Sequence, residues 1–260
     1  MNHFDKILEY YNNATVKDTN WEIIRFLLSN LSNIENMSIT EIADNTFVSK
    51  ATITRFVRKF GYSNFQEFKQ DIYNTYHNDL NASFRTSNQQ LELLKHKPEV
   101  FLETYTESIC EAIKDSTQLL DLDKIDTLIN SLLTRQSAIF AFNQPLTYAK
   151  EIQKDFLIKG KLISVGETFI KQKQIAERLD KQSTAVIFSN YGNYFKDYQQ
   201  IIDILIQNEV QLILVTLNYS SPLLINFDEV IVLSSKRFSD VGVYPLKLFT
   251  EYVVRRLMVM

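Results

Sequence analysis

The chain has 260 residues, of which 45% are hydrophobic, and its formal net charge at pH 7 is −3. The length is enough for two domains, and the hydrophobic content excludes general disorder. The slightly acidic total excludes a protein that coats nucleic acid over its whole surface, but it allows one local basic patch on an acidic body.

No apolar run approaches the roughly 18 to 20 residues that span a bilayer, and the first residues lack the apolar core of a signal peptide. We therefore expect a soluble, cytoplasmic protein without membrane contacts. The single cysteine, Cys110, excludes an intrachain disulfide and a cysteine zinc cluster. Its helical surroundings predict a buried structural thiol rather than a reactive one.

The first part of the chain has the pattern of a small all-helical domain. Thr19 and Glu22 have the spacing of a capping box and predict a helix start. A later helix is expected to begin at Ser63 and to run towards Tyr76. This helical domain is assigned to residues 1–76.

Between these helices, the stretch 38–62 has the pattern of two short helices joined by a tight turn, as in a helix-turn-helix. Ser49 can cap the second helix, and Gly61 can end it in the left-handed conformation. One side of that helix is an apolar stripe at helical spacing, made of Ile53, Phe56, Val57 and Phe60. The pattern therefore predicts a helix from about Lys50 to Phe60 with one buried face.

The opposite side of this helix is basic, with four Lys or Arg residues and no Asp or Glu between positions 48 and 62. Like charges on adjacent turns repel, and a phosphate backbone would offset that repulsion. A solvated helix face is the alternative, but the cap, the turn and the core spacing together favour DNA binding. The predicted contacts are Lys50, Ala51, Thr54 and Arg55 to base edges, and Ser49, Arg58 and Lys59 to phosphates.

Two residues of this stretch leave alternatives open. Thr40 either binds a phosphate or caps its own helix. Phe47 stands at a turn position where glycine is commonest, because that position requires positive φ. Either the turn differs slightly, or Phe47 anchors a neighbouring segment.

After the helical domain, residues 77–97 are polar and predict a linker or a loosely packed connecting helix. Residues 98–260 form the second predicted domain. Five short apolar runs, at 138–142, 162–165, 185–188, 212–215 and 230–233, are separated by segments long enough for crossover helices. They predict a three-layer α/β sandwich with a five-stranded, mostly parallel sheet, and a final helix from about Tyr244 to Leu257.

In such a sheet a ligand lies at the carboxyl ends of the strands, where the strand order reverses. For a flavodoxin-like order this place lies between the loops that follow the first and third strands. The residues assigned to it are Asn143, Gln144, Ser189, Asn190, Tyr191, Gly192 and Asn193. A loop of this composition can hold an anion at a helix N-terminus, although it is also an ordinary turn composition.

The residues SITEIA, VSKATITRFVRKFGYSNFQEFK, SNYGN and SPL before FDEVIVL resemble the RpiR-type bacterial transcription regulators, whose second half is a SIS (sugar isomerase) domain. The resemblance covers nearly the whole chain. It implies a homodimer or homotetramer that binds a palindromic double-stranded DNA operator and responds to a phosphorylated sugar. Such regulators usually control genes of sugar uptake and breakdown.

The chain departs from that family in the loops of the α/β domain. The loop after the first strand, 141–145, lacks the usual glycines and serine, and Tyr191 and Tyr194 replace hydroxyl residues after the third. An alternative is therefore a degenerate SIS-like domain that serves only oligomerisation. An isomerase is less favoured because all three histidines precede the α/β domain. No catalytic residue, metal site or cofactor is predicted, and the low net charge disfavours a purely architectural DNA binder.

Overall fold

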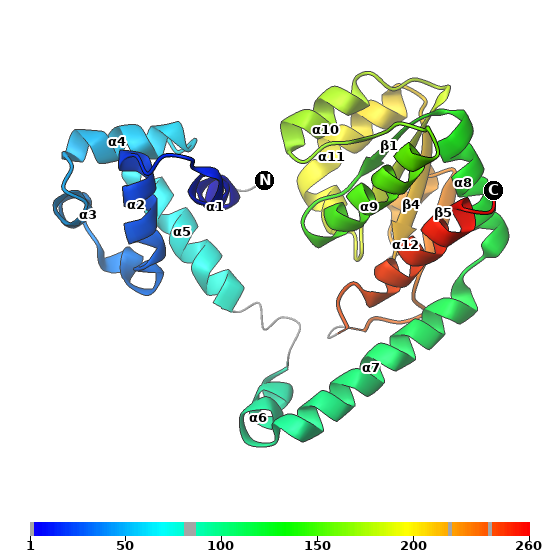
Figure 1. Ribbon diagram of the computed structural model, residues 1–260, viewed down its shortest axis with the longest axis horizontal. Helices are drawn as coiled ribbons and strands as arrows, with labels where there is room; N and C mark the ends of the chain where they lie inside the picture. Colours follow the sequence, from blue (N-terminus) through cyan, green and yellow to red (C-terminus); the bar gives the residue numbers. More distant parts are fainter. Residues whose placement is uncertain (1–2, 81–86, 218–219, 239–240) are drawn as a thin grey trace. The chain divides into compact units, whose positions relative to one another are not determined.

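The computed structural model describes residues 3–80, 87–217, 220–238 and 241–260, apart from the side chains of residues 3–6, 74–80 and 193. The chain divides into a helical unit, residues 1–84, and a mixed unit, residues 85–260 (Figure 1). This order of an all-helical region followed by an α/β region is the fold class that the sequence predicts.

The described part of the helical unit contains α1 (His3–Asn13), α2 (Thr19–Leu28), the 3-10 helix η1 (Leu31–Asn36), α3 (Ile39–Asn45), α4 (Lys50–Lys59) and α5 (Phe65–Leu80). Their apolar faces meet in one core that includes Ile24, Ile42, Phe56 and Phe68. Aromatic rings fill its centre: Phe56 meets Phe68 edge to face, with ring centroids 5.9 Å apart. The two predicted short helices of the helix-turn-helix are α3 and α4.

The N-terminus of α2 differs from the predicted capping box. Asp18, one residue earlier than expected, is the cap, and its Oδ1 accepts a hydrogen bond from the Trp21 N–H at 2.9 Å. Thr19 is already inside the helix, and Glu22 pairs with Arg25 instead. The prediction was wrong by one position because a carboxylate is at least as good a cap as a hydroxyl and suits the positive end of the helix dipole.

The described part of the mixed unit begins with two helices, α6 (Asn88–His96) and α7 (Pro98–Leu119), followed by α8 (Leu122–Thr134). The remaining elements are β1 (Gln136–Phe140), α9 (Gln144–Ile158), β2 (Ile163–Val165), α10 (Phe169–Ala176), β3 (Ser183–Phe188), α11 (Asn193–Gln207), β4 (Gln211–Thr216), η3 (Pro222–Asn226), β5 (Glu229–Val232) and α12 (Tyr244–Leu257). Among all the helices described, none is both long and apolar enough to cross a membrane.

The described strands form a parallel sheet in the flavodoxin-like order β2-β1-β3-β4-β5, which is the order assumed when the ligand site was located. Alternate residues of each strand face opposite layers. Ile139 and Val186 pack against α8, α9 and α12, whereas Phe140 and Ile187 pack against α10 and α11 (Figure 1). The three-layer α/β sandwich and the final helix are therefore confirmed.

Helices occupy much of the segment that was predicted as a linker. Helix α5 continues to Leu80, and Ser87 caps α6, which packs against α7. The domain limits at residues 76 and 97 stay a prediction. Cys110, however, is exposed on α7, so the expected buried thiol is wrong. Two residues further along, Ala112 is buried, and residues two apart lie on nearly opposite sides of a helix.

Candidate nucleic-acid interface and small-molecule site

Helix α4 turns one face to solvent because its other face is anchored in the core of the helical unit. The Ser49 Oγ accepts a hydrogen bond from the Thr52 N–H at 3.1 Å, which begins the helix. Gly61 follows its end with φ of 97°, in the left-handed region. All members of the predicted inner stripe are buried, namely Ile53, Phe56, Val57 and Phe60. The start, the end and the inner face predicted for this helix are confirmed.

The outer face of α4 is accessible over its whole length. Lys50, Ala51, Arg55 and Arg58 are exposed and Thr54 is half-buried. The Thr54 hydroxyl donates to the Lys50 carbonyl at 3.0 Å, so this side chain is held against its own helix. None of the four basic groups on α4 forms a salt bridge with an acidic residue that the structure describes. Their positive charges are therefore not neutralised by direct ion pairs with described residues.

Lys59 lies at the border of this face, beside α1. Its Nζ is 4.5 Å from the centre of the Tyr10 ring, a cation–π contact. It is also one of the smaller causes that lower the pKa of Asp18, whose largest cause is the hydrogen bond from Tyr10. The arrangement places the Lys59 charge at the edge of the outer face.

The turn before α4 and the cap of α3 bear on the two alternatives that the sequence left open. Phe47 adopts φ of 54° in place of the usual glycine, and its side chain is 96% exposed, so it anchors no other described segment. Ser38 caps α3 in a capping box with Glu41, whose pKa is lowered by the hydrogen bond that its carboxylate accepts from the Ser38 N–H. Thr40 therefore does not cap its helix, and a phosphate contact stays a prediction for it.

The two loops predicted to hold a small molecule follow β1 and β3, the neighbouring strands between which the strand order reverses. Asn143 and Gln144 begin α9 and are exposed. Gly192 precedes α11 with φ of 81°, which suits glycine. Asn190 is half-buried, and the side chain of Asn193 lies outside the described part of the structure. The tertiary fold thus brings the predicted loops to one edge of the sheet.

Ser189, the hydroxyl predicted to meet an anion, lies in the interior instead. It is 2% exposed, and its Oγ accepts a hydrogen bond from the Tyr194 N–H at 3.1 Å. Tyr191 is more accessible: its hydroxyl donates to the Phe238 carbonyl, and the Arg237 guanidinium lies 5.1 Å from its ring centre. A ligand at this loop would meet Asn190, Tyr191 and Arg237 before Ser189.

Aromatic side chains fill the space beneath these loops. Tyr194 is fully buried and stacks on Tyr198 with ring centroids 4.7 Å apart, and Phe142 stacks on Tyr198 at 5.3 Å. Burial raises the pKa of the Tyr194 hydroxyl, which therefore stays neutral and donates to the Gln172 Oε1 at 2.6 Å. These rings pack near the end of β1, beneath the two predicted loops.

Gln172 on α10 joins the ends of two strands, and the sequence analysis did not find it. Its Nε2 donates to the Ala141 carbonyl at 2.7 Å and to the Gly166 carbonyl at 3.0 Å. A fully buried amide with partners on three segments fixes their relative positions. No short-range pattern marks this glutamine, because its partners are distant in sequence.

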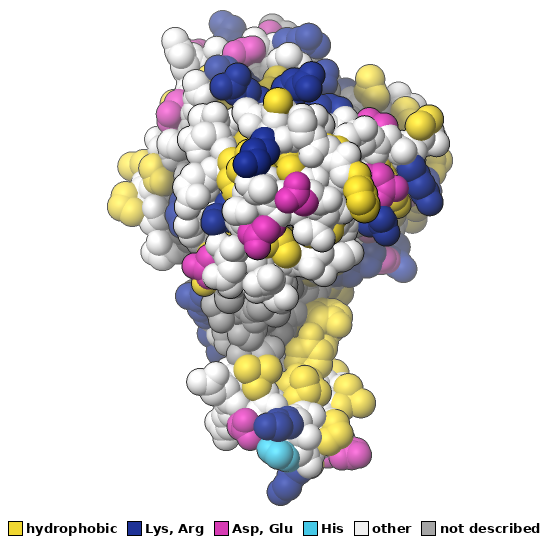
Figure 2. Space-filling view, turned by 90° about the vertical axis from the view of Figure 1, so that its left-hand side faces the viewer, with side chains coloured by type: hydrophobic (Ala, Val, Ile, Leu, Met, Phe, Trp, Pro, Cys, Tyr) yellow, Lys and Arg dark blue, Asp and Glu magenta, His cyan; other side chains and the backbone are white. Residues whose placement is uncertain are grey.

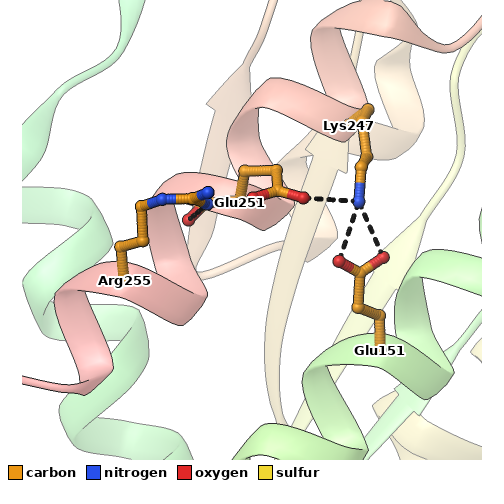
Figure 3. A network of polar contacts seen from close by, with 4 residues as sticks. All are labelled: Glu151, Lys247, Glu251 and Arg255. Atoms are coloured by element: carbon orange, nitrogen blue, oxygen red, sulfur yellow. Dashed lines mark hydrogen bonds and ion pairs between the residues drawn. The ribbon is translucent and has the colours of Figure 1, made fainter.

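Several carboxylates of the α/β domain are engaged in ion pairs. Lys247 bridges Glu151 on α9 and Glu251 on α12, and Arg255 also pairs with Glu251 (Figure 3). The hydrogen bond from Lys247, with that from Arg255, lowers the pKa of Glu251 to about 2. Glu167 pairs with Lys150 at 2.6 Å. Carboxylates held this way are weak bases.

The geometry defines a class: a helix-turn-helix domain with an accessible basic helix, followed by a flavodoxin-like α/β domain. Residues 1–79 match the family described as "Helix-turn-helix domain, rpiR family". The helical unit is therefore a helix-turn-helix domain of the rpiR family.

Curated relatives agree with this assignment. An uncharacterised HTH-type transcriptional regulator of Clostridium perfringens is 34% identical over 122 residues, which cover 45% of this chain and 42% of the relative. Another from Providencia stuartii is 21% identical over 182 residues, covering 68% of this chain and 62% of the relative. The chain thus spans less than two thirds of the length of either relative.

Solved structures share the fold at low identity. The Vibrio vulnificus NanR protein, complexed with ManNAc-6P, matches with a TM-score of 0.52 and 15% identity, covering 99% of this chain and 92% of that one. A candidate sugar-phosphate isomerase of Listeria monocytogenes matches with a TM-score of 0.50 and 14% identity, covering 61% of this chain and 87% of its own. The α/β domain therefore shares the fold of these proteins.

Proposed function

We propose that the chain is a sequence-specific DNA-binding transcription regulator of the cytoplasm. The observation that carries this proposal is the outer face of α4, which is exposed, basic and free of acidic partners among the described residues. Membership of residues 1–79 in a helix-turn-helix family supports it. Because one such helix covers few base pairs, we propose a homodimer or homotetramer on a palindromic operator.

We propose two groups of contacts to the double-stranded DNA, according to their place on the helix. The N-terminal part of a recognition helix meets base edges in the major groove, so Lys50, Ala51, Thr54 and Arg55 are proposed to read bases. The proposed phosphate contacts are Ser49, Arg58 and Lys59. Lys59 is placed at the rim of the interface because its ammonium group lies over Tyr10.

Operator titrations with two arginine variants test this division. Arg55→Ala should cost about 1–3 kcal/mol at particular base pairs and relax specificity there. Arg58→Ala should weaken binding to all sequences alike and lower the slope of log K against log salt by about 1. Arg25→Ala is the control, since Arg25 is exposed on α2 and pairs with Glu22. Equal losses for Arg55→Ala and Arg25→Ala would contradict the proposal.

We further propose that a phosphorylated sugar binds at the carboxyl edge of the sheet and modulates operator binding, with target genes in sugar uptake and breakdown. NanR, which shares the fold, is complexed with ManNAc-6P. The proposed contacts are Asn143, Gln144, Ser189, Asn190, Tyr191, Gly192 and Asn193. A ligand at 100 times its Kd should stabilise the α/β domain by about 2.7 kcal/mol, which a thermal-shift panel of sugar phosphates would detect.

A second candidate role for the α/β domain is oligomerisation without an effector. The stack of Phe142, Tyr194 and Tyr198 favours it, because these rings pack beneath the loops that were predicted to hold the ligand. Pro145 near the start of α9 also lacks an N–H that could meet a phosphate. No thermal shift with any sugar phosphate, together with intact oligomers, would support this second role. Turnover of an aldose phosphate would instead indicate an isomerase.

A further inference from the structure

The small-molecule site proposed at the carboxyl edge of the sheet has no charged side chain among its seven residues, which are Asn, Gln, Ser, Tyr and Gly. The Ser189 hydroxyl is buried and accepts from the Tyr194 N–H, and Pro145 offers no N–H. A phosphate group on an organic molecule carries a charge of about −1.5 to −2 at pH 7, and charge-assisted hydrogen bonds hold such groups most strongly. A phosphate at this site would therefore require a cation from another element.

Arg237, on the loop that follows β5, lies beside this site. That loop reaches the loop after β3, where the Tyr191 hydroxyl donates to the Phe238 carbonyl at 3.0 Å. The Arg237 guanidinium lies 5.1 Å from the centre of the Tyr191 ring, in a cation–π contact. Because Tyr191 is one of the seven proposed contacts, a ligand that meets its ring lies within reach of the guanidinium.

The charge and the N–H groups of Arg237 are available to a ligand. Arg237 is exposed, and it forms neither an ion pair nor a hydrogen bond with any residue that the structure describes. Lys236, its neighbour in the chain, is instead paired with Glu111 at 2.5 Å. A guanidinium has five N–H donors in one plane, and the contact with the Tyr191 ring uses none of them.

Helix α7 holds the loop that carries Arg237. The first half of α7 and α6 have exposed apolar side chains, which Figure 2 shows at the lower end of the view. The second half of α7 is instead joined to the loop after β5. Asp115 of α7 accepts hydrogen bonds from the Ser235 N–H at 2.8 Å and from the hydroxyls of Ser234 and Ser235. The Ser116 hydroxyl donates to the Leu233 carbonyl at 2.5 Å.

Both neighbours of Arg237 in the chain are fixed by contacts with α7. Lys236 is held by its ion pair with Glu111, and Phe238 packs against Ala112. The hydrogen bond from Tyr191 also fixes the Phe238 carbonyl. A group that is already held in place loses less conformational freedom when a ligand binds, so it contributes more to affinity.

We propose that Arg237 is the phosphate-binding residue of the small-molecule site. Its guanidinium donates to the phosphate oxygens beside the Tyr191 ring, and half-buried Asn190 supplies a neutral donor. The phosphate thus lies towards β5, away from Pro145 and the loop after β1. This inference rests on the proposed function only for the existence of a small-molecule site, and it adds a residue that the sequence analysis did not assign.

Titration of inorganic phosphate into the full chain, followed by phosphorus NMR line width, tests the assignment. The wild type should show saturable binding, and Arg237→Ala should raise the Kd at least tenfold because the charged donor is lost. Arg178→Ala is the matched control: Arg178 is also exposed, but it lies between α10 and β3, at the amino edge of the sheet. Its Kd should change less than twofold. Equal Kd values for Arg237→Ala and the wild type would overturn the proposal.

Both substitutions remove exposed side chains, so both variants should keep the wild-type melting temperature. Chemical modification gives a second readout that needs no variant. Phenylglyoxal reacts with accessible guanidinium groups, and peptide mapping reports the rate at each arginine. Saturating inorganic phosphate should slow the modification of Arg237 at least fivefold and leave that of Arg178 unchanged. The same rate at Arg237 with and without phosphate would contradict the assignment.

A panel of hexose phosphates separates this inference from the proposed function. A panel member that binds the wild type and Arg237→Ala equally would support the proposed effector and overturn the role of Arg237. Binding that requires Arg237 but leaves operator affinity unchanged would support the role of Arg237 and contradict regulation by the ligand. A wild type that binds neither inorganic phosphate nor any panel member would overturn both.

Discussion

The outer face of α4 and the loop after β3 are built in opposite ways. On α4 the charged side chains point to solvent, and the hydroxyl of Thr54 bonds only to its own helix. After β3 the polar groups are turned inward: the Ser189 hydroxyl accepts from the Tyr194 N–H in the interior, and the Tyr194 hydroxyl donates to Gln172 on another helix. One region is a convex surface, and the other is a packed interior crossed by hydrogen bonds.

The difference shows what each kind of partner demands of a fold. DNA is a large polyanion with a wide major groove. One exposed helix can therefore bind it, provided that the buried apolar face of the helix is anchored in a core. A small ligand needs a cavity, whose shape depends on every element around it. Here aromatic rings from α11 and the end of β1 pack beneath the loops that were predicted to hold the ligand. The basic helix is therefore the stronger of the two candidate sites.

The largest expected effect is the separate unfolding of the two units. Phe56→Ala removes a fully buried ring from the helical unit and should cost about 3–5 kcal/mol, most of the stability of so small a domain. Calorimetry should show that the unfolding transition of the helical unit is lost while that of the α/β domain is unchanged. DNA binding should be lost as well. The matched change Phe249→Ala should lower the unfolding temperature of the α/β domain and leave the transition of the helical unit unchanged. Simultaneous loss of both transitions in either variant would contradict independent units.

The next effect tests whether the interior of the α/β site is fixed. Tyr194→Phe keeps the ring but leaves the Gln172 Oε1 without its donor, and an unsatisfied buried acceptor costs about 1–3 kcal/mol. Urea unfolding of the α/β domain should show this loss. Tyr191→Phe is the control, because Tyr191 is only half-buried and water can replace its hydroxyl. An unchanged free energy of unfolding for Tyr194→Phe would mean that the site is loosely packed and can open.

A smaller effect concerns backbone strain at the turn before α4. Phe47 holds a left-handed conformation that costs a non-glycine residue roughly 1–2 kcal/mol, so Phe47→Gly should stabilise the helical unit by about 1 kcal/mol net. Its melting temperature should rise by a few degrees. Glu209→Gly, at the same φ of 54°, should raise the transition of the α/β domain in the same way. A lower melting temperature for Phe47→Gly would show that the ring makes a stabilising contact.

The smallest effect is the pH dependence of the ion pairs on α12. The pKa of Glu251 is about 2 in the folded chain against an ordinary value of 4.5, so its stabilising contribution is present above pH 4.5 and is lost as pH falls towards 2. Melting temperatures of wild type and Glu251→Gln should therefore converge between pH 4.5 and 2. A difference in melting temperature that stays constant across that pH range would show that the Glu251 ion pairs do not stabilise the folded chain.

Local patterns were enough where neighbours in sequence are also partners in space. The cap at Ser49 and the left-handed glycine at position 61 were both predicted. Predictions failed where an effect depended on a single position. Cys110 was assigned to the buried side of a helix and lies on the other, and Asp18 replaced Thr19 as a cap.

The sequence by itself determined the all-helical and the α/β region and the basic face of α4. Periodic apolar residues and helix caps specify helices and strands through interactions between residues a few positions apart. It also located the two loops at the edge of the sheet. Only the tertiary structure decided that Ser189 and Tyr194 face the interior and that Gln172 joins the ends of β1 and β2. Gln172 lies 31 positions from Ala141 and 22 from Tyr194. Packing of the whole domain, rather than any local preference, selects these contacts.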